Sequence, residues 1–307
     1  MFTMPTTLPL PTLRAAFGDR LQENVPLAQY TSARIGGPAD ALIPVTSADE
    51  LAETVSRLWE LAIPYTILGG GSNVLVSDKG VRGMVILNRA KAVRFDTGSK
   101  PKVRAEAGVV IANLARRTAA HGLAGLEWAA AVPGTVGGAA YGNAGAFGGD
   151  MSGNLIHAEL LTEKGRESWP VEKMEYGYRT SILKRQASKC VVLSAQLRLE
   201  HSTKEAVSVK IAEFSERRKA TQPPGASMGS MFKNPPGDFA GRLIEAAGLK
   251  GRRIGTAEIS PVHANFFINH GQTKAEDVRA LVNLAQKTVA EKFGVNLELE
   301  IELIGEW

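Results

Sequence analysis

Residues 128–149 read WAAAVPGTVGGAAYGNAGAFGG, and this stretch constrains the fold more than any other. It carries no charge between Glu127 and Asp150, and seven of its residues are glycine. Glycine inside a regular element costs about 0.5–1 kcal/mol relative to alanine, so seven would be expensive without a compensating role. Either positive-φ turns need them, or bare backbone approaches a large ligand whose phosphates bind peptide N–H groups. The composition favours a cofactor cradle over a purely structural turn cluster, and Pro133 and Asn143 argue against a membrane span.

The composition indicates a soluble globular protein with more than one core. The chain has 307 residues, 44% of them hydrophobic and 22% charged, which predicts two or three domains. Prolines interrupt the N-terminal sequence MFTMPTTLPLPTLR where a signal peptide needs an apolar core, so a cytoplasmic location is expected. The single Cys190 allows no intrachain disulfide, and the five histidines lack spacing such as HExxH, so we expect no metal.

The net charge is +5, and the basic residues include two short clusters, Arg217–Lys219 and Lys250–Arg253. No recognisable module for reading nucleic acid accompanies them, so we expect neither nucleic acid nor membrane as a partner. The clusters are solvated surface, or they steer a multiply anionic small substrate. The charge alone leaves both interpretations open.

A second glycine-rich segment lies between two predicted strands. The loop GGGSN at 69–73 follows YTIL at 65–68 and precedes VLV at 74–76. A Rossmann dinucleotide turn needs a strand, a GxGxxG loop and then a helix. Because a strand follows the loop here, the context argues against a Rossmann fold.

The character of the chain changes near residue 201. Before it, short predicted strands alternate with helices over 11–21, after the capping box Ser47–Glu50 and over 110–121. After it, longer helices are predicted over 204–220, 239–247 and 275–293. With a weaker boundary near residue 82, we expect three parts: 1–82 and 83–201, with the glycine loops between them, and 202–307.

Two segments of the last part could carry chemistry. Prolines stiffen both sides of the polar segment 227–234, although a serine such as Ser230 is usually a turn or cap residue. No GxSxG elbow supports a hydrolase triad. Residues 297–303 alternate apolar and acidic side chains, which predicts a half-buried strand over 296–304 that carries Glu300. The carboxylates of this strand either form a solvated acidic face or lie on a covered face, where their mutual repulsion would raise the pKa of one of them. Periodicity does not decide between these two interpretations.

Eight motifs follow one another from about residue 30 to 305. They are Arg34-Ile35-Gly36-Gly37, Gly69-Gly70-Gly71-Ser72-Asn73, Pro133-Gly134-Thr135-Val136-Gly137-Gly138, Asn143-Ala144-Gly145-Ala146, Tyr178-Arg179, Gly229-Ser230-Met231-Phe232-Lys233-Asn234-Pro235, His263-Ala264-Asn265-Phe266 and Glu300-Ile301-Glu302-Leu303-Ile304-Gly305. One glycine loop would be weak evidence, but eight ordered motifs over nearly the whole chain are highly specific. Together they resemble the motifs of the UDP-N-acetylenolpyruvoylglucosamine reductase family.

The resemblance implies an α+β fold and a flavin cofactor. The fold would be a two-lobed FAD-binding domain of the vanillyl-alcohol oxidase/p-cresol methylhydroxylase type, followed by a C-terminal α+β substrate-binding domain. FAD would bind without a covalent link, its pyrophosphate meeting the amides of residues 70–73 and the loop at 134–138. The residues implied to bind FAD are Arg34, Ile35, Gly36, Gly69, Gly70, Gly71, Ser72, Asn73, Pro133, Gly134, Thr135, Gly137, Gly138, Asn143, Gly145 and Ala146.

The implied reaction is hydride transfer in two halves for peptidoglycan precursor synthesis. NADPH as co-substrate reduces FAD, which then reduces the enolpyruvyl double bond of UDP-N-acetylglucosamine enolpyruvate to give UDP-N-acetylmuramate. Ser230 resembles the family's proton donor, and Arg179 and Glu300 resemble the pair that polarises the substrate carboxylate. We expect a monomer whose contacts with the sugar nucleotide are Tyr178, Lys233, Asn234, His263 and Asn265.

The chain departs from the family pattern in three places. Val262 stands where the family often has lysine before His263, and the 222–228 approach to Ser230 is shorter than expected. The extra tyrosine-bearing segment of the longer class is missing, so the chain resembles the shorter class.

Two other functions remain open. One is an FAD-dependent alcohol or hydroxy-acid oxidase of the same fold, although no histidine or cysteine that could tether a flavin lies inside the glycine-rich motifs. The other is a nucleotide-binding regulator without catalysis, which would be colourless, or yellow but not bleached by NADPH.

Overall fold

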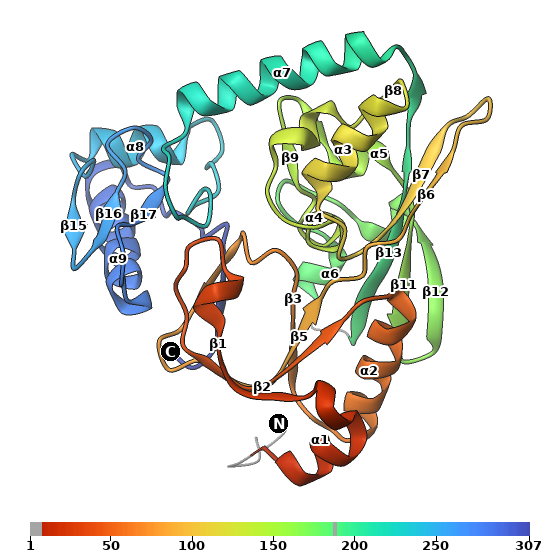
Figure 1. Cartoon of the computed structure of the whole chain (residues 1–307). Coiled ribbons are helices and arrows are strands. Elements are labelled where there is room, and N and C mark those ends of the chain that lie inside the picture. The colour runs from red at the N-terminus through yellow and green to blue at the C-terminus, as the bar shows by residue number, and fades with distance from the viewer. Residues whose placement is uncertain (1–7, 187–188) are drawn as a thin grey trace. The chain divides into compact units, whose positions relative to one another are not determined.

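The chain passes back and forth between two structural units in the computed structural model, which describes residues 8–186 and 189–307 (Figure 1). The first unit holds the described residues up to Ile43, Leu58–Ile86 and Thr221–Trp307, and the second holds Pro44–Arg57 and Leu87–Ala220. Residues 1–7, half of the N-terminal sequence considered above, lie outside the described part. The division into 1–82, 83–201 and 202–307 stays a prediction.

A four-stranded sheet forms the N-terminal part of the first unit. Its strand order is β1-β2-β5-β3, and β1 pairs with β2 in antiparallel register, with Val25 opposite Ala39. β4 lies outside this sheet and pairs in parallel with β18 near the C-terminus, with Val74 opposite Glu302. The predicted succession of strand, glycine loop and strand over 65–76 is confirmed. The elements are α1 (Leu10–Phe17), β1 (Gln22–Pro26), β2 (Pro38–Val45), β3 (Tyr65–Leu68), β4 (Val74–Val76), β5 (Val81–Asn88) and β18 (Glu302–Ile304).

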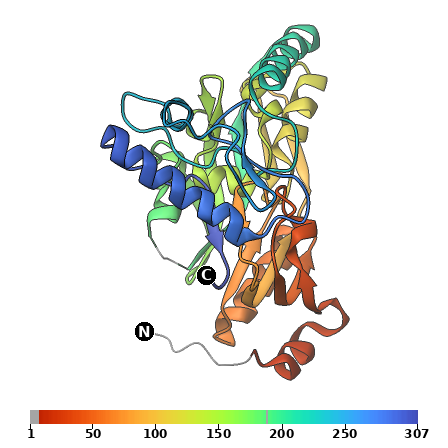
Figure 2. The same cartoon turned by 90° about the vertical axis from the view of Figure 1, so that its left-hand side faces the viewer.

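The rest of the first unit is a three-stranded antiparallel sheet with two helices. The strands β15 (Arg253–Ile254), β16 (Ala257–Ile259) and β17 (Phe267–Asn269) lie in that order, beside α8 (Ala240–Ala246) and α9 (Ala275–Phe293). In α9, the blue helix in Figures 1 and 2, the side chains of one face are buried, namely Val278, Leu281, Val282, Ala285 and Val289. The Asp78 carboxylate accepts the N–H groups of Ala275 and Glu276 at the start of this helix, at 2.8 and 3.0 Å.

The C-terminal strand is shorter than predicted. The prediction of a strand over 296–304 is wrong in its extent, because β18 covers Glu302–Ile304 and the main chain bends at Glu300 and Ile301. Leu297 and Ile301 are nevertheless only 4% exposed, so the alternation correctly identified inward-facing side chains. Alternation reports burial, whereas a continuous strand also needs an unbroken backbone partner.

The second unit is built on a five-stranded antiparallel sheet in the order β12-β11-β13-β7-β6, with α3 and α4 contributing to its core. β11 and β12 form an antiparallel hairpin, with Thr162 opposite Gly165. α4, which lies inside the glycine-rich stretch, contacts β13 and β7. The elements are α2 (Ala48–Glu60), β6 (Val93–Asp96), β7 (Lys102–Glu106), α3 (Ile111–Ala120), α4 (Val136–Gly142), β11 (Leu155–Thr162), β12 (Gly165–Pro170) and β13 (Cys190–Arg198).

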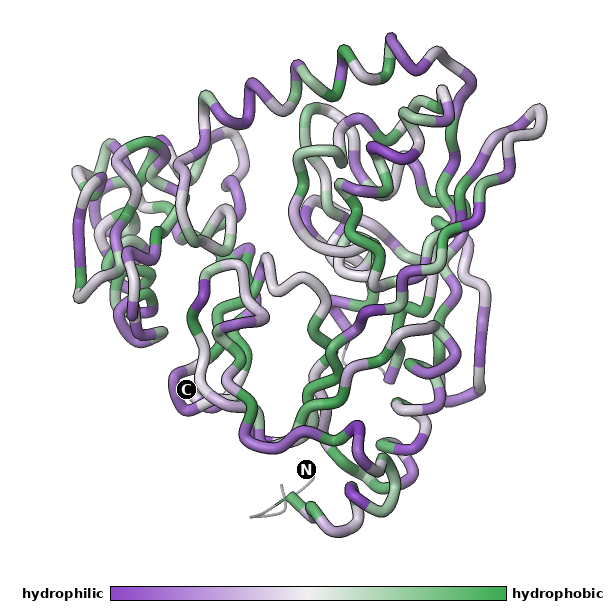
Figure 3. The backbone as a smooth tube through the Cα atoms, viewed as in Figure 1, coloured by the Kyte–Doolittle hydropathy of each residue, from purple (hydrophilic) through white to green (hydrophobic). Residues whose placement is uncertain are grey.

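Short elements and one long helix complete the chain. The helix α7 (Lys204–Thr221) carries hydrophilic residues along its whole length (Figure 3), and Val207 is its buried side chain. No helix within residues 8–186 and 189–307 combines the length and apolar character needed to cross a membrane. The short elements are β8 (Leu123–Ala124), β9 (Gly145–Ala146), β10 (Gly149–Asp150), α5 (Met151–Asn154), α6 (Ile182–Arg185) and β14 (Glu200–His201).

Candidate active site

The loop at 69–73 presents backbone N–H groups between β3 and β4. Gly71 has φ +59°, and a Cβ there would lie 2.1 Å from the Tyr30 carbonyl oxygen. The Gly71 carbonyl accepts the N–H of Ser32 at 2.9 Å. Within the described ranges, the N–H groups of Gly70, Gly71 and Ser72 donate to no protein acceptor. Successive unpaired N–H groups of this kind suit a phosphate.

The motif Arg34-Ile35-Gly36 lies in the same unit as this loop. The Thr31 hydroxyl donates to the Ile35 carbonyl at 2.9 Å and accepts the Ile35 N–H at 3.2 Å, while Asn269 Nδ2 on β17 donates to the Ala33 carbonyl at 2.8 Å. A Cβ on Gly36 would lie 2.8 Å from Val76 Cβ, so this glycine allows the motif to pack on β4. Asn269 was missed from the sequence, because a hydrogen bond to main chain 236 residues away leaves no local pattern; Thr31 bonds only four residues away and was not singled out either.

The motif at 133–138 begins α4 in the second unit. Gly134 has φ +104°, and a Cβ on Gly137 would lie 2.8 Å from Ala107 Cβ. A Cβ on Gly138 would have its nearest neighbour at 3.7 Å, which leaves room beside it. In the described part of the chain, the N–H groups of Thr135 and Gly138 donate to no protein acceptor. This part of the motif, which follows Pro133, therefore also fits an anionic group.

Asn143 ends α4 and connects it to neighbouring segments. It adopts the left-handed conformation at φ 49°, its Nδ2 donates to the Gly177 carbonyl at 3.0 Å, and its Oδ1 accepts the Ser152 N–H at 2.9 Å. Gly145 and Ala146 form β9, where a Cβ on Gly145 would lie 2.6 Å from Asp150 Cβ. Asn143 and Gly145 thus have packing roles in the protein itself.

Tyr178 and Arg179 form the tip of a tight hairpin in the second unit. Gly177 and Thr180 exchange backbone hydrogen bonds at 3.1 and 3.3 Å, and Arg179 has φ +56°. The Arg179 guanidinium carbon lies 5.3 Å from the centre of the Tyr178 ring. Tyr178 is 55% exposed. The Asn143 bond to Gly177 fastens this hairpin to the end of α4. The structure therefore brings Tyr178 and Arg179 together with the glycine-rich motif.

Ser230 and Glu300 lie on adjacent segments of the first unit. The Met231 carbonyl, one residue after Ser230, accepts the Glu300 N–H at 2.9 Å. Asn73, at the end of the 69–73 loop, donates from Nδ2 to the Glu300 carbonyl at 3.1 Å, and its own carbonyl accepts the Glu302 N–H at 2.9 Å. The predicted proton donor, the predicted acid and one predicted flavin loop are thus joined by backbone contacts.

Two residues predicted to bind substrate also have protein partners. The Lys233 ammonium pairs with the Glu298 carboxylate, and its side chain is only 15% exposed. The Oδ1 atom of Asn234 accepts the N–H of Ala240 at the start of α8, at 3.1 Å. These contacts hold both side chains near Ser230, and their substrate contacts stay a prediction.

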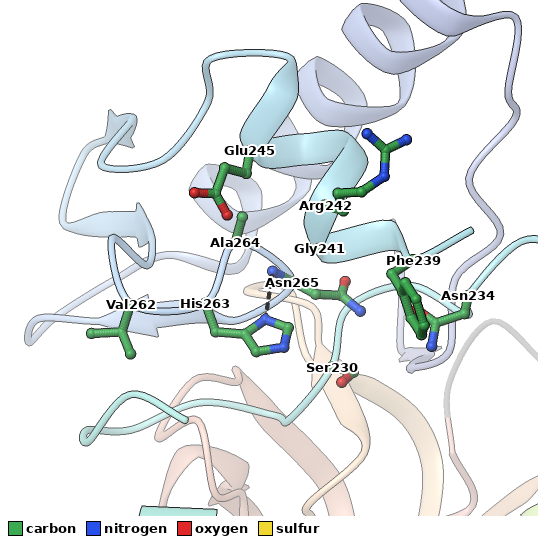
Figure 4. A pocket seen from close by; sticks show the side chains of 10 residues that line it. All are labelled: Ser230, Asn234, Phe239, Gly241, Arg242, Glu245, Val262, His263, Ala264 and Asn265. Atoms are coloured by element: carbon green, nitrogen blue, oxygen red, sulfur yellow. Dashed lines mark hydrogen bonds between the residues drawn. The ribbon is translucent and has the colours of Figure 1, made fainter. Parts of the chain in front are cut away.

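A cavity of about 390 Å³ lies beside Ser230, lined also by Asn234, Arg242 and His263 (Figure 4). His263 Nδ1 accepts the N–H of Asn265 at 3.2 Å, and burial lowers the pKa of this imidazole, so it is neutral near pH 7. The Nδ1 bond assigns the remaining ring proton to Nε2. Arg242 was not predicted from the sequence. The available signal was an acidic residue four positions before it.

Asp238 is that acidic residue, and it fixes one wall of the cavity. Its carboxylate accepts hydrogen bonds from Arg242, the first of them 2.6 Å long from Nε, and from the N–H of Phe239 at 2.7 Å. The Arg242 bond and then the backbone bond lower the pKa of Asp238 to about 2. Both groups therefore remain charged at neutral pH, at the N-terminal end of α8.

Comparison with known proteins identifies the parts of this arrangement. Residues 39–169 match the model of an FAD binding domain, and residues 220–304 match that of the C-terminal domain of UDP-N-acetylenolpyruvoylglucosamine reductase. A reductase of that name from Chloroflexus aggregans is 45% identical over 289 residues, covering 92% of this chain and 97% of the relative. The corresponding protein of Rubrobacter xylanophilus is 46% identical over 281 residues, covering 92% and 94%.

A solved structure agrees with these relatives. The crystal structure of UDP-N-acetylenolpyruvylglucosamine reductase from Thermus caldophilus superposes with a TM-score of 0.80 at 37% identity, covering 93% of this chain and 99% of that one. The FAD-binding region and the separate C-terminal domain define an FAD-dependent oxidoreductase of α+β fold. The identity and the coverage together show that the chain belongs to the UDP-N-acetylenolpyruvoylglucosamine reductase family.

Proposed function

We propose that this protein uses NADPH and FAD to reduce the enolpyruvyl double bond of UDP-N-acetylglucosamine enolpyruvate to UDP-N-acetylmuramate. Family membership supports the substrate and the reaction. The observation that carries the proposal is the junction in the first unit, where Met231 bonds to Glu300 and Asn73 of the glycine loop bonds to Glu300 and Glu302. A hydroxyl and a carboxyl group on segments bonded to one another, next to a glycine loop, support a reduction that is followed by protonation.

The residues at both glycine loops fit FAD. We assign the N–H groups of Gly70–Ser72, Thr135 and Gly138 to the binding of FAD, as the family resemblance implies for their motifs. Bound FAD supplies the redox chemistry by accepting a hydride from NADPH and passing it to the substrate. We assign the other predicted contacts, including Arg34–Gly36, to the rest of the cofactor.

Ser230 is the group we assign to protonation. Hydride arriving at the terminal carbon of the double bond leaves an electron pair on the carbon beside the carboxylate. The Ser230 hydroxyl gives its proton to that carbon, a new C–H bond forms, and water returns a proton to the serine oxygen. A hydroxyl is a weak acid, but protonating a carbanion is strongly downhill, so placement matters more than acidity.

Arg179 and Glu300 are assigned to the substrate carboxylate. The carboxylate takes up charge as hydride arrives, and a guanidinium placed there stabilises that charge. Glu300 must be protonated or paired with a cation, because a bare carboxylate would repel the developing charge. The neighbouring contacts to the sugar nucleotide fall to Tyr178, Lys233, Asn234 and His263. We propose that the enzyme acts as a monomer in the cytoplasm.

An anaerobic titration tests this function. The purified yellow protein should be bleached by NADPH, and the enolpyruvyl sugar nucleotide should then restore the oxidised flavin spectrum without oxygen. Protein that NADPH does not bleach would indicate a regulator rather than an enzyme. Flavin that stays with the acid-precipitated protein would indicate a covalent oxidase, and flavin released into the supernatant is the result we expect.

A further inference from the structure

The segment that carries Ser230 depends on neighbouring segments for its position. Residues 230–233 belong to no helix or long strand, and Gly229 before them has φ +80°. The side chains of Met231 and Phe232 are fully buried and anchor the segment to the core of the first unit. Their burial fixes depth, whereas hydrogen bonds must fix the rotation of the backbone that points the Ser230 hydroxyl.

On one side, residues 298–300 hold the main chain of this segment through backbone hydrogen bonds. The Lys233 N–H donates to the Glu298 carbonyl at 2.8 Å, and the Met231 carbonyl accepts the Glu300 N–H at 2.9 Å. These two bonds leave the N–H of Phe232, and its carbonyl, facing the other way.

On that other side, Asn265 satisfies the main chain of Phe232 with its side chain. Oδ1 accepts the Phe232 N–H at 2.9 Å, and Nδ2 donates to the Phe232 carbonyl at 2.8 Å. The Asn265 carbonyl accepts the Met231 N–H at 2.7 Å. Ser230 itself pairs with Phe266 in an isolated antiparallel bridge.

Such a pair of bonds needs a carboxamide at this position. An amide presents an acceptor and a donor side by side, which matches the N–H and carbonyl of one residue. Asn265 is only 3% exposed. If a replacing side chain could not bond to the Phe232 N–H or carbonyl, that group would therefore be buried without a partner, which is destabilising. Asn265 also lines the cavity (Figure 4), but both atoms of its amide already bond to the main chain of Phe232.

We infer that Asn265 is a positioning residue, which sets the Ser230 hydroxyl against the cavity by holding the main chain of Phe232, rather than a contact to the sugar nucleotide. This inference rests on the proposed function, because it concerns the half-reaction that Ser230 serves. Loss of Asn265 should therefore slow protonation of the substrate while leaving hydride transfer from NADPH to the flavin almost unchanged.

Anaerobic stopped-flow measurements on the FAD-loaded protein test this role. For Asn265→Ala we expect flavin reduction by NADPH near the wild-type rate and reoxidation by the enolpyruvyl substrate slowed on the order of a hundredfold, as for a displaced catalytic group. The substrate concentration that gives half-maximal reoxidation should stay the same, because no substrate contact is lost. Equal slowing of both half-reactions, or a rise in that concentration with an unchanged maximal rate, would overturn the inference.

A double-mutant comparison separates positioning from an independent contribution. If Asn265 acts through Ser230, adding Asn265→Ala to Ser230→Ala should slow reoxidation little further. A second loss as large as the first would refute this. Asn265→Asp carries the same test if the alanine variant does not fold, because it keeps the acceptor for the Phe232 N–H and lacks the donor for its carbonyl.

A control variant removes a different hydrogen bond from the same unit. Thr273 is 7% exposed, and its hydroxyl lies 2.8 Å from that of Thr256. Thr273→Val should lower thermal stability and leave the ratio of the two half-reaction rates unchanged. Failure of the proposed function would show separately, as wild-type protein whose reduced flavin the substrate does not reoxidise.

Discussion

Replacing Gly71 with alanine should destabilise the first unit and weaken FAD binding. Alanine at φ +59° costs about 1–2 kcal/mol, because its Cβ crowds the following carbonyl. That Cβ would also lie 2.1 Å from the Tyr30 carbonyl oxygen and 2.8 Å from Thr31 Cα. Both are backbone atoms, so the loop must shift, and overpacking of this kind costs about 1–3 kcal/mol. The expected total loss in the free energy of unfolding is about 2–5 kcal/mol.

Gly294→Ala provides the matched control in the same unit. Gly294 has a similar φ of +68°, and nothing lies within 4 Å of the position its Cβ would take. It should therefore show the conformational cost without the clash. Urea unfolding of the FAD-free proteins measures the difference, and flavin fluorescence titration measures binding. We expect FAD affinity to fall about tenfold or more for Gly71→Ala alone, the worth of one charge-assisted hydrogen bond. Equal stability losses and equal FAD affinities in the two variants would refute the close-approach argument.

Four further outcomes follow from the site. Ser230→Ala should leave flavin reduction by NADPH unchanged and slow reoxidation by substrate on the order of a hundredfold or more, and stopped-flow traces with both halves equally slowed would contradict its role. Glu300→Gln should retain more turnover than Glu300→Ala if the glutamate acts protonated; equal turnover would remove that inference. Arg179→Ala should lower turnover about a hundredfold in steady-state assays, and a loss below about tenfold would argue against charge stabilisation. Burial lowers the pKa of His263 in the folded protein, so below about pH 6.5 the unfolded chain binds a proton that the folded chain does not, and the free energy of unfolding falls as the pH falls. His263→Gln should reduce this pH dependence in urea titrations, and a dependence equal to that of the wild type would contradict the prediction.

The glycine-rich stretch could be recognised from sequence, but the division of its glycines between two roles could not. Gly137, Gly145 and Gly149 are required by the protein itself, since a Cβ on each would lie within 3 Å of Ala107, Asp150 or Trp128. Gly138 would accept a Cβ at an ordinary contact distance, 3.7 Å from Thr135 Oγ1, and its N–H has no protein acceptor among the described residues. Gly137, Gly145 and Gly149 thus have the structural role that composition suggested, whereas a contact to the cofactor stays a prediction for Gly138.

The site residues show a similar limit. Motifs predict which residues matter, but Asn265 and Lys233 show that a predicted ligand contact can instead be engaged by the protein. The partners of Asn265 lie 33 residues away in sequence, and Glu298, the partner of Lys233, lies 65 residues away. Local spacing carries no information about such pairs. The same holds for Asn269, whose contact to Ala33 spans 236 residues.

Asn73 explains why the C-terminal segment and the first glycine loop fold as one unit although most of the chain separates them. Its side chain and its carbonyl bond to Glu300 and Glu302, and β4, which begins at the next residue, pairs with β18. A displacement of the loop that presents the Gly70–Ser72 amides must therefore move the backbone of Glu300, and the Glu300 N–H in turn holds Met231 beside Ser230. Binding of an anionic cofactor group to these amides would restrict the same backbone. The loop predicted to bind the cofactor is in this way linked to Glu300 and to the segment of Ser230, so a change at one of them is expected to reach the others.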